Sequence, residues 1–295
     1  MKPKYFITIG TFDGVHLGHQ ALFARLEQAA VQHQLKPLVL YFPYPPKTLL
    51  SPAPAMTVLS TPPEKKALLK SCLTAPREEL NFYMYREYTP EQFLKKVLLD
   101  KYRCGGILAG PDFMFGKNQA GNDTWLKQKC SQLGIPFEMI PFYDGSKGEK
   151  ISSSLIRKTL AAGNIPLANA MLGRPYSIEG RVVPGKKLGR KLGFPTANLD
   201  VNFYKLLPLG VYAVQVRVGR SMYRGVCNIG FRPTVNPIDS IIPLTEVHIL
   251  DFNKSIYGRR IQVSFLRRLR GEEKFDSLDA LKAQLAADKE QARRD

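Results

Sequence analysis

The side chains near the start of the chain that are best suited to chemistry are two histidines. His16 and His19 lie three residues apart around Gly18, within residues 10–19 (GTFDGVHLGH). Both imidazoles can point into one pocket and donate hydrogen bonds to a phosphate as its negative charge grows. A lone histidine here would more often cap a helix, but the whole string favours a phosphate site. We predict catalytic roles for both histidines, and phosphate contacts for Gly10, Phe12, Asp13, Gly14 and Gly18.

A second segment, residues 185–198 (GKKLGRKLGFPTAN), combines glycines, cations and oxygen ligands. Its glycines allow the loop to bend around phosphates, and its Lys and Arg side chains neutralise them. In a strand, residues two apart point the same way, so the Thr196 hydroxyl and the Asn198 amide oxygen can share one Mg²⁺. Taken alone, residues 185–191 are more typical of a basic surface loop.

The elements around the histidines predict a sheet edge. Residues 5–10 (YFITIG) and 38–42 (LVLYF) are typical of buried strands, and residues 20–33 between them have helical spacing. This order predicts a parallel sheet with a right-handed crossover, and such sheets bind ligands at the carboxyl ends of their strands. The alternation continues to about residue 150 and predicts a doubly wound α/β domain. We expect helices at 63–73, 89–101 and 123–133, strands at 105–110 and 137–140, and a proline-rich surface loop at 43–63.

The pattern changes after residue 172. Helices are expected over 152–162 and 166–172, and short strands then alternate with Gly- and Pro-marked turns, which is typical of an antiparallel β-barrel. The expected strands are 212–218, 223–229, 246–250 and 261–265, and an amphipathic helix is expected over 277–294. We therefore predict an α/β domain over 1–172 and a β-barrel domain over 173–295.

The composition is that of a globular protein with a basic surface. A chain of 295 residues with 44% hydrophobic residues fits two domains with buried cores. The net charge of +18 favours polyanions, either nucleic acid or small phosphorylated ligands. The 4 cysteines form no CxxC pair, and we find neither a signal peptide nor a membrane span. The sequence thus predicts a cytoplasmic protein.

Residues 10–19 resemble the HxGH signature of the nucleotidylyltransferases, in the form found in bifunctional prokaryotic riboflavin kinase/FAD synthetases. Residues 110–116 (GPDFMFG) resemble the flavin and nucleotide loop of that family, which implies flavin contacts from Asp112 and Phe113. Residues 151–157 (ISSSLIR) resemble its ISSTxIR motif, which implies that Ser152, Ser153 and Arg157 hold phosphates of ATP. The implied reaction joins FMN and ATP to give FAD and pyrophosphate, through positioning and charge neutralisation.

The second half resembles riboflavin kinase more closely still. Residues 189–198 (GRKLGFPTAN) match its signature, and residues 210–213, 228–234 and 246–252 agree with it. The resemblance implies that Glu246 is the base that deprotonates the ribityl 5′-hydroxyl as it attacks ATP. Without the resemblance, a salt bridge would be the preferred role of Glu246, and His248 is assigned a structural one. Also implied are ATP contacts from Gly185, Lys187, Gly189 and Lys191, flavin contacts from Asn228 and Arg270, and Mg²⁺ at Thr196 and Asn198.

Three hypotheses stay open on sequence alone. The first is a bifunctional enzyme that converts riboflavin to FMN and then to FAD with ATP and Mg²⁺. The second keeps the kinase but has a degraded adenylyltransferase, because Met114 and Leu155 stand where the family often has arginine. The third is a non-catalytic flavin-sensing or RNA-binding relative, against which the dispersed basic residues and the lack of an RNA-binding strand speak. Nucleic acid and membranes are not expected partners, and self-association is left open.

Overall fold

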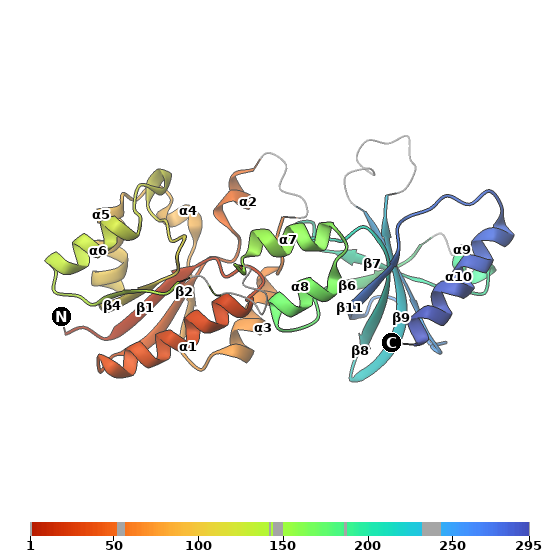
Figure 1. Cartoon of the computed structure of the whole chain (residues 1–295), viewed down its shortest axis with the longest axis horizontal. Coiled ribbons are helices and arrows are strands. Elements are labelled where there is room, and N and C mark those ends of the chain that lie inside the picture. Colours follow the sequence, from red (N-terminus) through yellow and green to blue (C-terminus); the bar gives the residue numbers. More distant parts are fainter. Residues whose placement is uncertain are drawn as a thin grey trace. The chain divides into compact units, whose positions relative to one another are not determined.

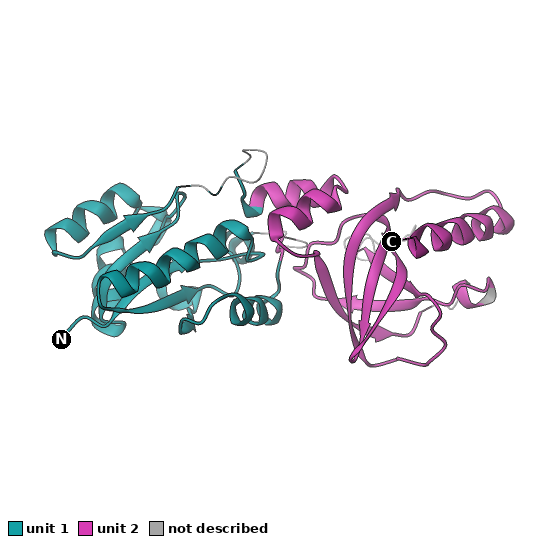
Figure 2. Cartoon of the chain, turned by 60° about the horizontal axis from the view of Figure 1, so that its bottom comes forward, with its two compact units in different colours: residues 1–52, 60–153 teal, residues 53–59, 154–295 magenta. Residues whose placement is uncertain are grey.

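The chain folds into two compact units, coloured separately in Figure 2. The computed structural model describes residues 2–51, 57–141, 143, 150–185, 188–231 and 243–294. The first unit comprises residues 1–52 and 60–153, and the second comprises residues 53–59 and 154–295. The division falls just inside the helix that starts at Ser153, and it assigns a short segment before Ser60 to the second unit.

The first unit contains a parallel sheet with the strand order β3-β2-β1-β4-β5 (Figure 1). The strands are β1 (Tyr5–Gly10), β2 (Lys36–Tyr41), β3 (Arg77–Glu79), β4 (Cys104–Ala109) and β5 (Phe137–Met139). The helices are α1 (Leu17–Gln32), α2 (Pro46–Leu50), α3 (Pro62–Cys72), α4 (Phe82–Tyr85), α5 (Pro90–Gln92), η1 (Phe93–Lys101), η2 (Lys117–Gln119) and α6 (Asp123–Gln132). The strand order reverses between β1 and β4, which is where open α/β sheets bind ligands. The predicted doubly wound class is confirmed.

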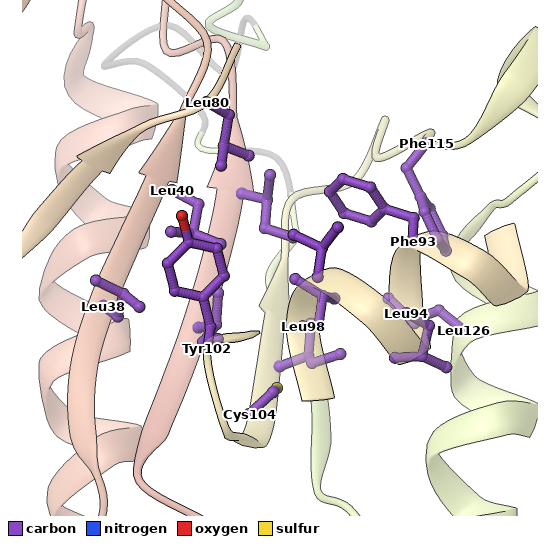
Figure 3. Close-up of a cluster of buried hydrophobic side chains, with 14 of the residues drawn as sticks. Leu38, Leu40, Leu80, Phe93, Leu94, Leu98, Tyr102, Cys104, Phe115 and Leu126 are labelled. Carbon is purple, nitrogen blue, oxygen red and sulfur yellow. The ribbon is translucent and has the colours of Figure 1, made fainter. Parts of the chain in front are cut away.

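Alternating side chains of the strands supply two cores, one on each face of the sheet. Ile7 and Ile9 of β1 join a cluster with residues of η1 and α6, whereas Phe6 joins a cluster with residues of α1 and α3. Figure 3 shows the first cluster, where Phe93 of η1 and Leu38 of β2 are among the buried side chains. With helices on both faces, the sheet leaves its carboxyl edge as the place for a ligand.

The second unit contains a closed antiparallel barrel with the strand order β10-β7-β6-β11-β8-β9. Its strands are β6 (Ser177–Val183), β7 (Ala197–Val201), β8 (Gly210–Val218), β9 (Ser221–Gly230), β10 (Leu244–Ile249) and β11 (Arg260–Arg270). Its helices are α7 (Ser153–Ala161), α8 (Ile165–Leu172), α9 (Leu188–Lys191) and α10 (Leu278–Arg293). The predicted barrel with a C-terminal helix is confirmed.

The side chains of strand β10 alternate between the inside and the outside of the barrel. Thr245, Val247 and Ile249 are buried, so they point into the barrel, while Glu246 and His248 between them point outward. Helix α10 packs on that outer face, through a cluster that contains Ala292 with residues of β8 and β9. The outward side chains of β10 therefore lie on the side of the barrel that α10 partly covers.

Several elements differ from the sequence predictions. The edge strand β3 was missed because its three residues (REE) have no apolar alternation. The predicted loop over 43–63 contains α2 and the start of α3, each with a proline in the first turn, where proline favours a helix. The single helix expected at 89–101 is α5 followed by the π-helix η1. None of the described helices is long and apolar enough to cross a membrane.

Candidate active sites

The loop after β1 brings the two predicted histidines together at the start of α1. The rings of His16 and His19 are stacked, with centroids 3.6 Å apart. The ring of Phe12 meets His19 edge-on at 5.3 Å. A Cβ at Gly18 would lie only 3.2 Å from His16, so a glycine leaves room for that ring. The pair stands at a helix N-terminus, where free N–H groups and the helix dipole favour phosphate.

The same loop has a strained backbone. Phe12 and Val15 have φ angles of 44° and 43°, in the left-handed region that β-branched residues rarely enter. Such strain costs about 1–3 kcal/mol per residue and persists only where the surroundings enforce it. Both side chains are buried in the cluster with α1, which offsets this cost and fixes the loop that leads into His16.

Asp13 has a role in this loop that the sequence did not reveal. Its carboxylate is buried and accepts hydrogen bonds from the backbone N–H and the hydroxyl of Ser60, at 3.0 and 3.2 Å. Its backbone carbonyl accepts a bond from the hydroxyl of Ser153 at 2.8 Å. Asp13 thus connects three segments of the first unit, and a direct phosphate contact from it stays a prediction.

The predicted flavin residues lie after β4. Phe113 is partly buried and stacked on Phe115 at 5.3 Å, whereas Asp112 is exposed and 3.4 Å from the ammonium group of Lys150. Because β4 and β1 are parallel neighbours, their carboxyl ends open at the same edge of the sheet. The loop that carries Asp112 and Phe113 therefore begins beside the histidine loop.

The predicted phosphate residues of the ISSSLIR segment divide between the units. Ser152 and Ser153 belong to the first unit, and the hydroxyl of Ser153 binds the histidine loop. Arg157 belongs to the second unit, where its Nε donates to the carbonyl of Thr57 at 2.7 Å. A phosphate contact from Arg157 stays a prediction.

The second unit has a pocket of about 440 Å³ against the outward face of β9 and β10. One wall comes from α10, through Leu281, Leu285 and Asp288, and the others come from the barrel and its loops. The pocket also contains Phe231, His248, Glu272 and Phe275. The predicted residues that line it are Gly189, Thr196, Asn228, Glu246 and Arg270.

Two polar side chains of the pocket wall, Asn228 and Glu246, form a row with Asn198 on the neighbouring strand β7. Glu246 on β10 stands opposite Asn198 on β7 and opposite Asn228 on β9, so all three point to one face. Asn198 is 8% exposed, and its Oδ1 has no hydrogen-bond partner among the described residues. A buried acceptor without a donor is costly, and it suits a cation that would complete its coordination.

Two glycines bring the preceding loop close to this row. A Cβ at Gly185 would overlap the side-chain amide of Asn198, and a Cβ at Gly189 would overlap the carbonyl of Phe194 and reach the Thr196 hydroxyl. Glycine therefore allows the loop to lie directly on the predicted metal ligands. The predicted Lys187 and the side chain of Lys191 lie outside the described residues.

His248 connects β10 by a hydrogen bond to the segment that carries Thr196. Its Nδ1 lies 2.8 Å from the carbonyl of Pro195, so Nδ1 carries the proton of this bond. Burial lowers the pKa of His248, which favours the neutral ring. Burial likewise raises the pKa of the Cys227 thiol far above its ordinary value, which suits a packing role.

Arg270 is held by a residue that the sequence reasoning missed. Its Nε and Nη2 donate to both carboxylate oxygens of Asp288 on α10, at 3.1 and 2.9 Å. The side chains of Arg270 and Asp288 are 15% and 2% exposed, so the pair is buried. A signal existed, because Asp288 follows Leu281 and Leu285 at helical spacing, where an apolar residue is expected.

Removing the carboxylate of Asp288 is expected to destabilise the second unit. In Asp288→Ala the buried guanidinium of Arg270 would lose its partner, which typically costs about 3–5 kcal/mol. Glu290→Ala is the matched control, because Glu290 is an exposed partner of Arg293 on the same helix and such pairs contribute about 0–1 kcal/mol. Urea unfolding of both variants measures the difference. Equal free energies of unfolding would contradict the expected role of the buried pair.

Comparisons with known proteins match both halves of the chain. The family models described as FAD synthetase and riboflavin kinase match residues 1–155 and 172–295. The bifunctional riboflavin kinase/FMN adenylyltransferase of Haemophilus influenzae is 36% identical over 97% of this chain and 92% of its own length. The protein of the same description from Escherichia coli K12 is 38% identical over 97% and 91%. A crystal structure from Streptococcus pneumoniae, described as a macrolide-efflux protein, has a TM-score of 0.85 at 34% identity and covers 99% of this chain and 95% of that one.

Proposed function

The chain belongs to the family of bifunctional riboflavin kinase/FMN adenylyltransferases, and from this premise we propose which residues carry each reaction. The enzyme phosphorylates riboflavin to FMN with ATP, and then adenylylates FMN to FAD with release of pyrophosphate. We assign adenylyl transfer to residues 1–172 and the kinase to residues 173–295. Since both reactions consume ATP, we propose that the enzyme lies in the cytoplasm, where ATP is available. Nucleic acid is not a proposed partner.

The proposed kinase base is Glu246, and the observation that carries this assignment is its place in the pocket wall, opposite Asn228 and Asn198. The Glu246 carboxylate would accept the proton of the ribityl 5′-hydroxyl as that oxygen attacks the γ-phosphate of ATP. Asn228, opposite it on β9, would orient the ribityl chain by hydrogen bonds. The apolar side chains that line the same pocket, among them Leu281 and Phe275, would contact the flavin ring.

We propose that Mg²⁺ binds beside Asn198, at the end of the row opposite Asn228. Thr196 and Asn198 offer a hydroxyl and a buried amide oxygen, ligand types that this cation accepts. When bound, Mg²⁺ neutralises charge on the phosphates of ATP. Gly185 and Gly189 would let backbone N–H groups approach the same phosphates, and Arg270, fixed by Asp288, would present a cation to the flavin side of the pocket.

For adenylyl transfer we propose that His16 and His19 donate hydrogen bonds to phosphate oxygens of ATP. Their donors would favour the charge that develops while the FMN phosphate attacks the α-phosphorus and pyrophosphate departs. Support comes from the stacked rings at the start of α1, on the sheet edge that the loop after β4 shares. Flavin contacts from Phe113 and Asp112 on that loop complete the proposed site.

One assay tests the complete proposal. The purified protein is incubated with riboflavin, ATP and Mg²⁺, and the flavins are separated by chromatography. FMN followed by FAD is the expected result, and added EDTA should stop both steps. FMN without FAD would mean that the first half has lost its activity, and neither product would overturn the proposed sites.

Adding one methyl group at Gly185 is expected to weaken binding of ATP to the kinase site. In Gly185→Ala the new Cβ would overlap the amide of Asn198, so the loop or the proposed Mg²⁺ ligand must move. We expect the KM for ATP in FMN formation to rise about tenfold, equivalent to about 1.4 kcal/mol of binding. Conversion of FMN to FAD in the same preparation serves as the control and should keep its rate. An unchanged KM would show that the loop does not contact ATP.

A further inference from the structure

Ser60 is a buried polar residue beside the histidine loop that no proposed step uses. It lies directly before Thr61, the N-cap of α3, and is 1% exposed. Ser60 is far from the histidine loop in the sequence, yet it makes three hydrogen bonds with that loop. Its backbone N–H and its hydroxyl donate to the Asp13 carboxylate, and the same hydroxyl accepts the N–H of Gly14 at 3.0 Å.

These bonds act where the loop is strained. Asp13 and Gly14 are the two residues between Phe12 and Val15, both of which have left-handed backbone angles. The strained shape persists only if its surroundings enforce it. The Ser60 hydroxyl fixes the middle of this stretch through one side chain and one backbone group, while the buried Phe12 and Val15 fix its ends.

The position of the first histidine depends on that stretch. His16 follows Val15 directly and is the N-cap residue of α1. A shift of the strained stretch therefore moves the backbone from which its ring projects. His19 is stacked on His16, so a shift of one ring displaces the other.

We propose that Ser60 is a positioning residue for adenylyl transfer, which acts through Asp13 and Gly14 to hold the stacked His16 and His19. This inference rests on the proposed role of the two histidines. The two donors of Ser60 also satisfy the buried Asp13 carboxylate within the protein, so that this anion does not compete with phosphate for donors of the loop. Without the hydroxyl, the N–H of Gly14 would lose its acceptor in a buried place.

The test compares Ser60→Ala with Ser71→Ala, the same exchange at an exposed serine of α3 that bonds only locally. The kcat and KM of FMN adenylylation are measured, with riboflavin phosphorylation as the control for the rest of the chain. We expect kcat to fall between about tenfold and 10²-fold in Ser60→Ala, since catalytic groups displaced by about 1 Å lose up to that much. The KM for ATP should stay nearly unchanged, and Ser60→Thr, which keeps the hydroxyl, should restore most of the rate.

Folding of the first unit is followed separately. The sequence contains a single tryptophan, Trp125, which lies in α6 of the first unit. Its fluorescence therefore reports unfolding of that unit. All rates are measured below the unfolding temperature of each variant. Asp13→Ala and the double variant complete a cycle, in which the double variant should be no slower than the slower single variant, because both changes remove the bond between the Ser60 hydroxyl and Asp13.

Several results would overturn the inference. These are a kcat equal to that of Ser71→Ala, a loss of rate that follows the unfolded fraction seen by Trp125, and independent effects of Ser60→Ala and Asp13→Ala. His19→Ala separates this failure from a failure of the proposed site. If His19→Ala loses activity and Ser60→Ala does not, only the positioning role is wrong. If His19→Ala keeps full activity, the histidine site itself is wrong.

Discussion

Glu246→Gln is expected to lower the kcat of riboflavin phosphorylation by about 10²–10⁴-fold, the range that a positioned general base contributes. The amide keeps the size of the side chain and its place opposite Asn198 and Asn228, but it cannot take the proton of the attacking hydroxyl. The KM for ATP should change little, because Glu246 is assigned to the hydroxyl and not to the nucleotide. Initial rates of FMN formation, resolved by chromatography, measure the effect.

The control for this substitution is Glu179→Gln. Glu179 is a half-exposed strand glutamate of the same barrel, on β6, and lies 3.6 Å from Arg260 at the surface. Glu179→Gln should leave the rates of both reactions unchanged. FAD formation from supplied FMN should also keep its rate in Glu246→Gln. If Glu246→Gln phosphorylates riboflavin at the rate of the unmodified enzyme, another group is the base, and the polar row serves binding or structure.

His19→Ala is expected to lower the kcat of FAD formation from FMN by about 10²–10³-fold, the usual loss when one donor to a developing oxyanion is removed. The truncation also removes the ring on which His16 is stacked and which Phe12 meets edge-on. FMN formation from riboflavin should be unaffected, so the variant should accumulate FMN. The measurement is a time course of both flavins from riboflavin and excess ATP.

His33→Ala is the matched control, because His33 lies in the same unit and follows the other end of α1. Its ring stacks on Phe6 and its Nε2 is 3.7 Å from Glu138, away from the histidine loop. The variant should form FAD at the normal rate. Loss of both reactions in His19→Ala would point to misfolding, and normal FAD formation would exclude a catalytic role for His19.

The parts of the fold that the sequence predicted are those whose signals are local. Buried strands such as 5–10 and 38–42 carry continuous apolar runs, and the barrel strands alternate between turns. The histidine pair was predictable as a site because its glycines and its place between a strand and a helix are contiguous in the chain. Glu246 was not predictable as a catalytic base from its pattern alone. A lone glutamate in a strand is equally consistent with a salt bridge, and only the family resemblance indicated a catalytic role.

The residues that sequence reasoning missed act through partners far away in the chain. Ser60 donates two hydrogen bonds to Asp13, and nothing in residues 57–61 indicates that contact. Asp288 matters because it binds Arg270, and the only local sign was a carboxylate at a position spaced for an apolar side chain. Hydrogen bonds of this kind are set by tertiary packing, which a periodic pattern does not encode.

The wall that α10 supplies to the proposed kinase pocket also sets an order of events during translation. Residues 281, 285 and 288 line that pocket, so its binding surface is incomplete on a nascent chain until the ribosome has released them. The segments that form the first unit, with its histidine pair, are all synthesised by residue 153. Domains generally fold as units from the N-terminus during synthesis. The half proposed to consume FMN is therefore ready to fold before the half proposed to produce FMN can hold its flavin.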